Sequence, residues 1–142
     1  MVRILEHRHR ISLAEVKSAI GFDQPKLRSA DDVKAIRVEG TYLLYETATG
    51  PNPAGPLSEF EVRIVLPYDF PRGEPSVVET AGRIPRTPDR HVNGDGTCCV
   101  TVWEHWLATA DDHSVAAFIA GPVHEYFLAQ LWFEKKKKWP FG

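Results

Sequence analysis

The segment Phe60–Leu66 and the turn that ends it constrain the fold of this chain more than any other feature. Apolar and other side chains alternate along it, with Phe60, Val62, Ile64 and Leu66 on one side and Glu61 and Arg63 on the other. This period of two is typical of a strand with one buried face. Pro67 ends the strand, and prolines at 71 and 75 make the turn that follows rigid. The chain must therefore contain a sheet with a core on one side.

Further strands and loops are predicted on both sides of this segment. Val33–Thr47 is rich in β-branched and aromatic residues, and Gly40 interrupts it, which predicts either a bulged strand or two short strands. Residues 22–32 read as a polar connector, and residues 76–80 as a short strand. Residues 81–98, which include Pro85, Pro88, Gly94 and Gly96, predict a long irregular loop, which in a compact domain is usually functional.

Helices are predicted at the two ends of the chain. Residues 11–20 form an amphipathic pattern that begins with a capping box, Ser12 with Glu15. A second helical region begins at Ser114 as N-cap, is broken at Gly121-Pro122, and continues as a helix that ends in Lys135–Lys138. Helix, antiparallel strands, long loop and helices in this order predict an α+β domain with a meander of about four strands.

Composition narrows the classes of function. The 142 residues fit one domain, spanning 1–142, and can bury a core. With 17 basic and 19 acidic residues, the net charge of −2 predicts no nucleic-acid partner. No stretch approaches 18 uninterrupted apolar residues and the N-terminus lacks an apolar signal region, so we expect a soluble cytoplasmic protein without a membrane partner.

Both cysteines lie in one glycine-rich loop, His91–Val100. Cys98 and Cys99 are adjacent, and since a vicinal disulfide is strained, two free thiols in a reducing compartment are expected. The loop lacks the C-x₂-C spacing of a zinc site, and no cofactor is predicted. A thiol on a tight loop beside a histidine and an asparagine suits acyl-thioester chemistry. A carrier thiol, a hydrolase nucleophile and an ordinary cysteine pair all stay open on this basis.

Three motifs together resemble the ubiquitin-conjugating enzyme family, and the resemblance as a whole covers the chain from the first helix to about Phe133. The strand that runs into Pro67, Phe70-Pro71 and Pro75 is similar to the family's proline-paced turn. His91-x-Asn93 resembles its His-Pro-Asn motif, and Gly96–Val100 resembles the sequence around its active-site cysteine. Trp106 resembles the tryptophan that follows the active site.

The resemblance implies a UBC-like fold and a cysteine acyl transferase. It places the nucleophile at Cys99 and an oxyanion donor at Asn93, and it includes His91 in the site. The imidazole of His91 can hold the loop by bonding its backbone, and a general-base role is the alternative. Divergent bacterial members act in anti-phage systems, so the implied partners are an activating enzyme and a ubiquitin-like or cGAS-like nucleotidyltransferase protein. Val92 replaces the family's proline and the spacing from Asn93 to Cys99 is shorter than usual, and both departures bear on the oxyanion role.

The residues themselves leave alternatives at each position. Cys98 should point away from Cys99 and pack inward, because side chains alternate along an extended chain. Asn93 could instead close a turn. His105 or His113 could lie nearer the thiol than His91 does. Asp111 and Asp112 either lie near an incoming amine or favour a helix N-terminus. Lys135–Lys138 form either a patch that binds a partner or a solvated face.

Two other functions compete with the transferase. One is a binding module with the same fold but no catalysis, against which the retained Cys99 argues. The other is a Cys/His hydrolase or deconjugase, which needs a base within hydrogen-bond reach of the thiol and a third group that orients the base.

Overall fold

A computed structural model of the chain describes residues 22–30 and 35–140. The predicted N-terminal helix at 11–20 lies outside the described residues. The α+β class, the antiparallel sheet and the C-terminal helix are confirmed. The elements in chain order are β1 (Phe22–Ala30), β2 (Ala35–Leu44), β3 (Ser58–Pro67), β4 (Ser76–Glu79), the 3₁₀ turn η1 (Pro88–Arg90), α3 (Trp103–Thr109), α4 (Val115–Phe118), η2 (Ile119–Val123) and α5 (His124–Lys136).

The four strands form one antiparallel sheet in the order β1-β2-β3-β4. The predicted alternation of β3 is confirmed, because Phe60, Val62, Ile64 and Leu66 are all buried. Their partners on β2 face the same side, with Tyr42 opposite Phe60 and Val38 opposite Ile64. On the other face, Thr41 donates a hydrogen bond to Glu61 at 2.7 Å. One face of the sheet is therefore the core and the other is polar.

Two strand predictions are wrong. Gly40 neither bulges β2 nor divides it, because β2 pairs with β3 without a register shift and Gly40 lies opposite Val62. Residues 22–32 were expected to be a connector, yet Phe22–Ala30 forms β1. Pro25 has no N–H for a sheet ladder, but β1 lies at the sheet edge, and its register shifts between Asp23 and Lys26. An edge position and an irregularity at the proline make a polar segment acceptable as a strand.

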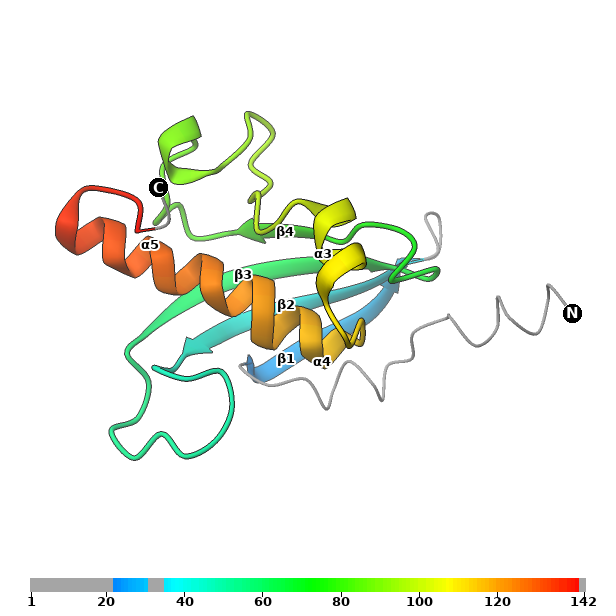
Figure 1. Ribbon diagram of the computed structural model, residues 1–142, viewed down its shortest axis with the longest axis horizontal. Helices are drawn as coiled ribbons and strands as arrows, with labels where there is room; N and C mark the ends of the chain where they lie inside the picture. The colour runs from blue at the N-terminus through cyan, green and yellow to red at the C-terminus, as the bar shows by residue number, and fades with distance from the viewer. Residues whose placement is uncertain (1–21, 31–34, 141–142) are drawn as a thin grey trace, which may run out of the picture.

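A helical layer covers the core face of the sheet, with α5 running across it (Figure 1). Ser114 is the predicted N-cap, and its side chain accepts the Ala117 N–H at 3.1 Å. The predicted break at Gly121-Pro122 is wrong, since α4, η2 and α5 follow one another without interruption. The residues around Pro122 form a wider π-helical turn, which accommodates the missing N–H and the bulk of the proline ring.

Aromatic side chains fill the space between the helices and the sheet. Phe127 of α5 contacts the rings of Tyr42 and Phe60, with centroids 5.4 and 4.7 Å apart. Phe70, from the turn after β3, packs against Trp103 and Phe118. The turn and the helices after the cysteines thus share one core. No helix in the described part of the chain is both long and apolar enough to span a membrane.

Candidate functional site

The two cysteines lie on one arm of a small hairpin beside β4. The Asn93 N–H donates to the Thr97 carbonyl at 2.9 Å, and the Cys99 N–H donates to the His91 carbonyl at 2.8 Å. The Cys98 N–H donates to the Val77 carbonyl of β4 at 2.7 Å, which attaches the hairpin to the sheet. Gly96, at φ +93°, makes the tight return between the arms. The expected irregular loop therefore ends in an ordered structure.

The two thiols have opposite environments. Cys98 is 8% exposed and belongs to the core, whereas Cys99 is exposed. Burial raises the pKa of the Cys98 thiol, so this sulfur stays protonated at neutral pH. The predicted alternation is confirmed, while the nucleophilic role of Cys99 stays a prediction.

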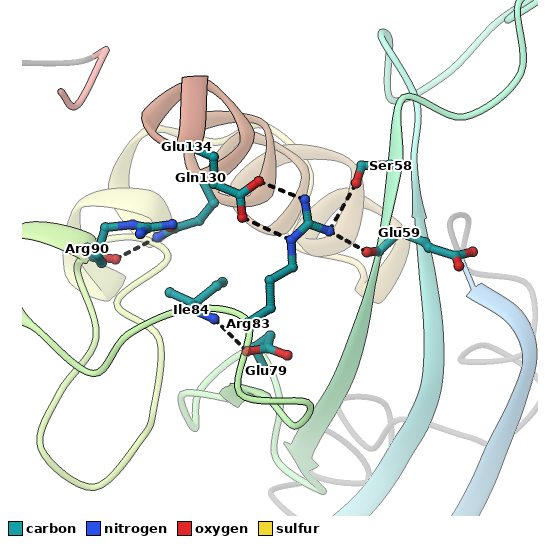
Figure 2. A network of polar contacts seen from close by, with 8 residues as sticks. All are labelled: Ser58, Glu59, Glu79, Arg83, Ile84, Arg90, Gln130 and Glu134. Carbon is teal, nitrogen blue, oxygen red and sulfur yellow. Dashed lines mark hydrogen bonds and ion pairs between the residues drawn. The ribbon is translucent and has the colours of Figure 1, made fainter. Parts of the chain in front are cut away.

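Helix α5 holds the first arm of the hairpin from inside. The side chain of Gln130, fully buried, accepts a hydrogen bond from Arg90 Nε at 2.8 Å and donates one to the Arg90 carbonyl at 2.6 Å (Figure 2). Tyr126 donates its hydroxyl hydrogen to the same carbonyl at 3.0 Å and lies 3.4 Å from the His91 carbonyl. The His91 carbonyl in turn accepts the Cys99 N–H. Helix α5 therefore fixes the backbone at the exposed thiol through the main chain of Arg90 and His91.

A second anchor joins the preceding loop to α5 and β3. Arg83 donates from Nε and Nη2 to the two carboxylate oxygens of Glu134, at 2.9 and 2.8 Å (Figure 2). Its Nη1 reaches Ser58 Oγ at 3.0 Å and the Glu59 carbonyl at 2.7 Å. This hydrogen-bonded pair lowers the pKa of Glu134 and raises that of Arg83.

A cavity of about 220 Å³ opens beside Cys99. Its walls come from the turn before β4, from the hairpin and from the helices that follow. Glu74 is the only one of its described lining residues with a charged side chain, and none of them is a histidine. The lining residues are Glu74, Pro75, Ser76, Asn93, Thr97, Cys98, Cys99, Val100, Thr101, Trp103 and Phe118. The cavity beside Cys99 thus presents hydroxyl, amide and apolar groups and one carboxylate.

Asn93 lines the same cavity as Cys99, as the predicted site requires. Its Nδ2 donates to Thr97 Oγ1 at 3.0 Å, and that hydroxyl donates to Asp95 Oδ1 at 2.6 Å. The hydrogen bonds from the Thr97 hydroxyl and N–H lower the pKa of Asp95. Together with the Asn93–Thr97 bond they close the hairpin, which is the turn role. Among the described residues, Thr97 is the one acceptor of the Asn93 side-chain amide, so its second amide hydrogen is available to a bound group.

The described histidines have partners or positions away from this cavity. The ring of His91 stacks on Trp139 with centroids 4.3 Å apart, and its backbone has a left-handed φ of 56°. His113 Nε2 lies 3.3 Å from the Trp106 carbonyl, and His105 is exposed on α3. The main chain of His91, more than its imidazole, contributes to the arrangement around Cys99.

Other predicted positions have structural roles. Asp112 Oδ1 accepts the Ser114 N–H at 2.8 Å, which lowers the pKa of the carboxyl and supports the N-terminus of α4. Trp106 is buried against Trp103 and Phe118 and does not line the cavity. Asp111 and Asp112 do not line it either.

Sequence reasoning missed Glu74, Tyr126 and Gln130. Gln130 lies among apolar positions of the α5 pattern, and a glutamine on an apolar helix face is the signal that could have indicated a buried polar anchor. Glu74, in an exposed turn, has no comparable signal, because only the folded chain brings it to the cavity of Cys99.

No family model matches the chain, and no curated protein matches it significantly. Among solved structures, it is similar to the UEV domain of yeast Vps23, crystallised in complex with a Vps27 PSDP peptide. The two are 12% identical with a TM-score of 0.48, over 80% of this chain and 74% of the other. The family of the chain is not shown by these comparisons, and the resemblance of its motifs to ubiquitin-conjugating enzymes stays a prediction.

Proposed function

We propose that the chain carries an acyl group as a thioester on Cys99 and passes it to an amine, in the manner of a ubiquitin-conjugating enzyme. The observation that supports this most is the exposed thiol beside a cavity, on a hairpin whose backbone is anchored to β4 and to α5. Thiol exchange loads the site: the Cys99 sulfur attacks an incoming thioester, its proton leaves with the departing thiol, and the acyl carbon changes partner.

The lining of the cavity favours an acyl carrier over a Cys/His hydrolase. A hydrolase needs a base within hydrogen-bond reach of its nucleophile and a third group that orients this base. No histidine is among the described residues that line the cavity, and the rings of His91 and His113 contact tryptophans. Transfer of an acyl group from one sulfur atom to another has no need of such a base, because it requires only that the attacking thiol be partly ionised.

Asn93 and His91 have separate roles in this proposal. The second amide hydrogen of Asn93 stabilises the oxyanion when the acyl carbon becomes tetrahedral, and losing one such donor costs about 10²- to 10³-fold in rate. His91 contributes its carbonyl, which accepts the Cys99 N–H and fixes the direction of the thiol. The imidazole is architectural, through its stack on Trp139.

The partners follow from the chemistry and from the motif resemblance. An activating enzyme supplies the thioester, and the acyl group is the C-terminus of a ubiquitin-like protein or of a cGAS-like nucleotidyltransferase. The setting that the resemblance implies is bacterial anti-phage defence. A non-catalytic module with the same fold differs in one property: its biological activity would survive replacement of Cys99 by alanine.

Intact-mass analysis of the protein expressed in its source cells and purified without reductant tests the proposal. We expect wild type and Cys98→Ser to carry a protein adduct that excess thiol removes, since a thioester exchanges with thiols. Cys99→Ser should carry either an adduct that thiols do not remove or none. The proposal fails if wild type has no thiol-labile adduct, or if Cys99→Ala has the same one.

A further inference from the structure

The cavity beside Cys99 has a single charged wall. Glu74 comes from the turn between β3 and β4, whereas Asn93, Thr97 and Cys99 come from the hairpin across the cavity. The other polar side chains among its lining residues carry hydroxyls, thiols, one amide and the indole N–H of Trp103. Within the described part of the chain, no hydrogen bond or ion pair engages the carboxylate of Glu74. Its charge is therefore available to a molecule that enters the cavity.

The turn that carries Glu74 is held in place at both ends. Phe70 is buried and its N–H donates to the Pro67 carbonyl at 2.9 Å. Gly73 packs so closely that an added Cβ would overlap the carboxylate of Asp69 and approach the Pro67 ring to 2.8 Å. Pro75, on the other side of Glu74, is buried. The backbone at Glu74 is thus fixed by its neighbours, and it places the exposed side chain of Glu74 among the residues that line the cavity.

We propose that Glu74 binds the incoming amine and accepts its proton as the amine attacks the thioester on Cys99, so that the acceptor is a cationic primary amine such as a lysine side chain. This inference rests on the proposed acyl-carrier function and goes beyond it by naming the acceptor class and a catalytic residue. A negative cavity attracts an ammonium group and repels carboxylates and phosphates.

The chemistry requires a group of this kind. A lysine ammonium has an ordinary pKa of about 10.4, so little of it is nucleophilic at neutral pH. In the reaction, the amine nitrogen attacks the acyl carbon, the C–N bond forms and the C–S bond breaks. One proton of the ammonium leaves to solvent before the attack, because an ammonium nitrogen has no free electron pair. The second passes from the attacking nitrogen to the Glu74 carboxylate and from there to the departing Cys99 thiolate. The nitrogen becomes acidic as it attacks, which is when a carboxylate can accept its proton.

Single-turnover discharge of loaded protein tests the role of Glu74 without an activating enzyme. The full chain is loaded by thiol exchange with the mercaptoethanesulfonate thioester of ubiquitin, and Cys99→Ala shows that the adduct is on Cys99. Discharge is then measured with free L-lysine and with hydroxylamine, which is uncharged at neutral pH. Glu74→Gln is compared with wild type and with Glu104→Gln, a matched change of an exposed carboxylate on α3 that does not line the cavity.

We expect Glu74→Gln to slow discharge to lysine by about 10²-fold while discharge to hydroxylamine stays within about twofold of wild type. The deficit with lysine should narrow near pH 9.5, where more of the amine is neutral. Glu104→Gln should match wild type. Equal lysine rates in Glu74→Gln and wild type, or an equal loss with both nucleophiles, would overturn the role of Glu74 alone. Failure of wild-type Cys99 to accept the acyl group would overturn the carrier function and this inference with it.

Discussion

Cys98 and Cys99 show how one peptide bond separates two kinds of thiol. The N–H of Cys98 bonds to β4 and its side chain enters the core, while the N–H of Cys99 bonds across the hairpin and its side chain meets solvent. In an extended backbone, successive side chains point in opposite directions, so burying one exposes the other. The same geometry points the two side chains in opposite directions and leaves the Cys99 thiol exposed to solvent.

Alkylation should distinguish the two thiols. With iodoacetamide at pH 8 under native conditions, Cys99 should be modified while Cys98 is protected, because Cys98 is buried and burial raises its pKa. Peptide mapping by mass spectrometry measures both sites, and denaturant should expose Cys98. In Cys99→Ser, native labelling should be almost absent. Comparable native rates at the two cysteines would show that the hairpin is not ordered as described.

Residue roles could be predicted from the sequence where they follow from local backbone geometry. The opposite burial of the cysteines and the Ser114 cap needed only strand alternation and helix-end chemistry. The stack of His91 on Trp139 could not be predicted, because it depends on the chain folding back after α5. Glu74 was missed for the same reason, because only the tertiary fold places it at the cavity beside Cys99.

At the scale of elements, the hairpin depends on its glycine turn. Gly96 has a φ of +93°, a region that side chains rarely adopt, and a Cβ there would lie 3.0 Å from Arg86 Cζ. Gly94, two residues earlier, has no atom within 4 Å of such a Cβ and no left-handed φ. Only one of the two glycines in this turn is therefore required by the backbone.

Replacing these glycines tests the hairpin. Gly96→Ala should lower the free energy of unfolding by about 1–2 kcal/mol, since alanine is strained at that φ. Gly94→Ala, the matched control, should change it by less than about 0.5 kcal/mol. Urea denaturation followed by tryptophan fluorescence measures both. Equal effects of the two substitutions would mean that the left-handed turn at Gly96 does not form.

Element types were predictable where the hydrophobic pattern is strong, as in β3, and less so where tertiary context decides. The segment of β1 is polar and contains Pro25, so no hydrophobic pattern predicts a strand there. It forms a strand by pairing with β2 at the sheet edge. Gly121-Pro122 is an ordinary helix-breaking signal. Here Ile119, Pro122 and Val123 are buried, and packing keeps the helix continuous through a π-helical turn.

At the scale of the whole molecule, one arginine ties three parts of the fold together. Arg83 of the loop after β4 binds Glu134 of α5, Ser58 and Glu59 of β3, and its guanidinium lies 4.0 Å from the centroid of the Phe60 ring. These contacts bring the loop that leads to the hairpin against the helical layer (Figure 2). Such long-range pairing of charges has no signature in the sequence.

Stability should depend on pH through Glu134. Its folded-state pKa is lowered, first by the hydrogen bond from Arg83, so the ionised form stabilises the fold. This stabilisation is fully present above the unfolded-state pKa of about 4.3 and is lost as pH falls through the lower folded-state value. Glu134→Gln should therefore cost about 1 kcal/mol at pH 7. The cost should shrink below about pH 4.

The control for this prediction is Glu125→Gln, an exposed carboxylate on the same helix, which should have little effect at either pH. Urea unfolding at pH 7 and at pH 3 measures the three proteins. If Glu134→Gln had the same cost at both pH values, the stabilisation would come from packing or neutral hydrogen bonds and not from the charge on Glu134.

Whether Cys99 carries an acyl group is tested most directly by locating the adduct on the wild-type protein. The protein is isolated from its source cells without reductant, digested at low pH, and mapped by tandem mass spectrometry before and after treatment with neutral hydroxylamine. We predict that a protein C-terminus is attached to Cys99 and is removed by hydroxylamine, with Cys98 unmodified. An adduct found only on Cys98 or on a lysine, or no adduct on Cys99 at all, would contradict the account.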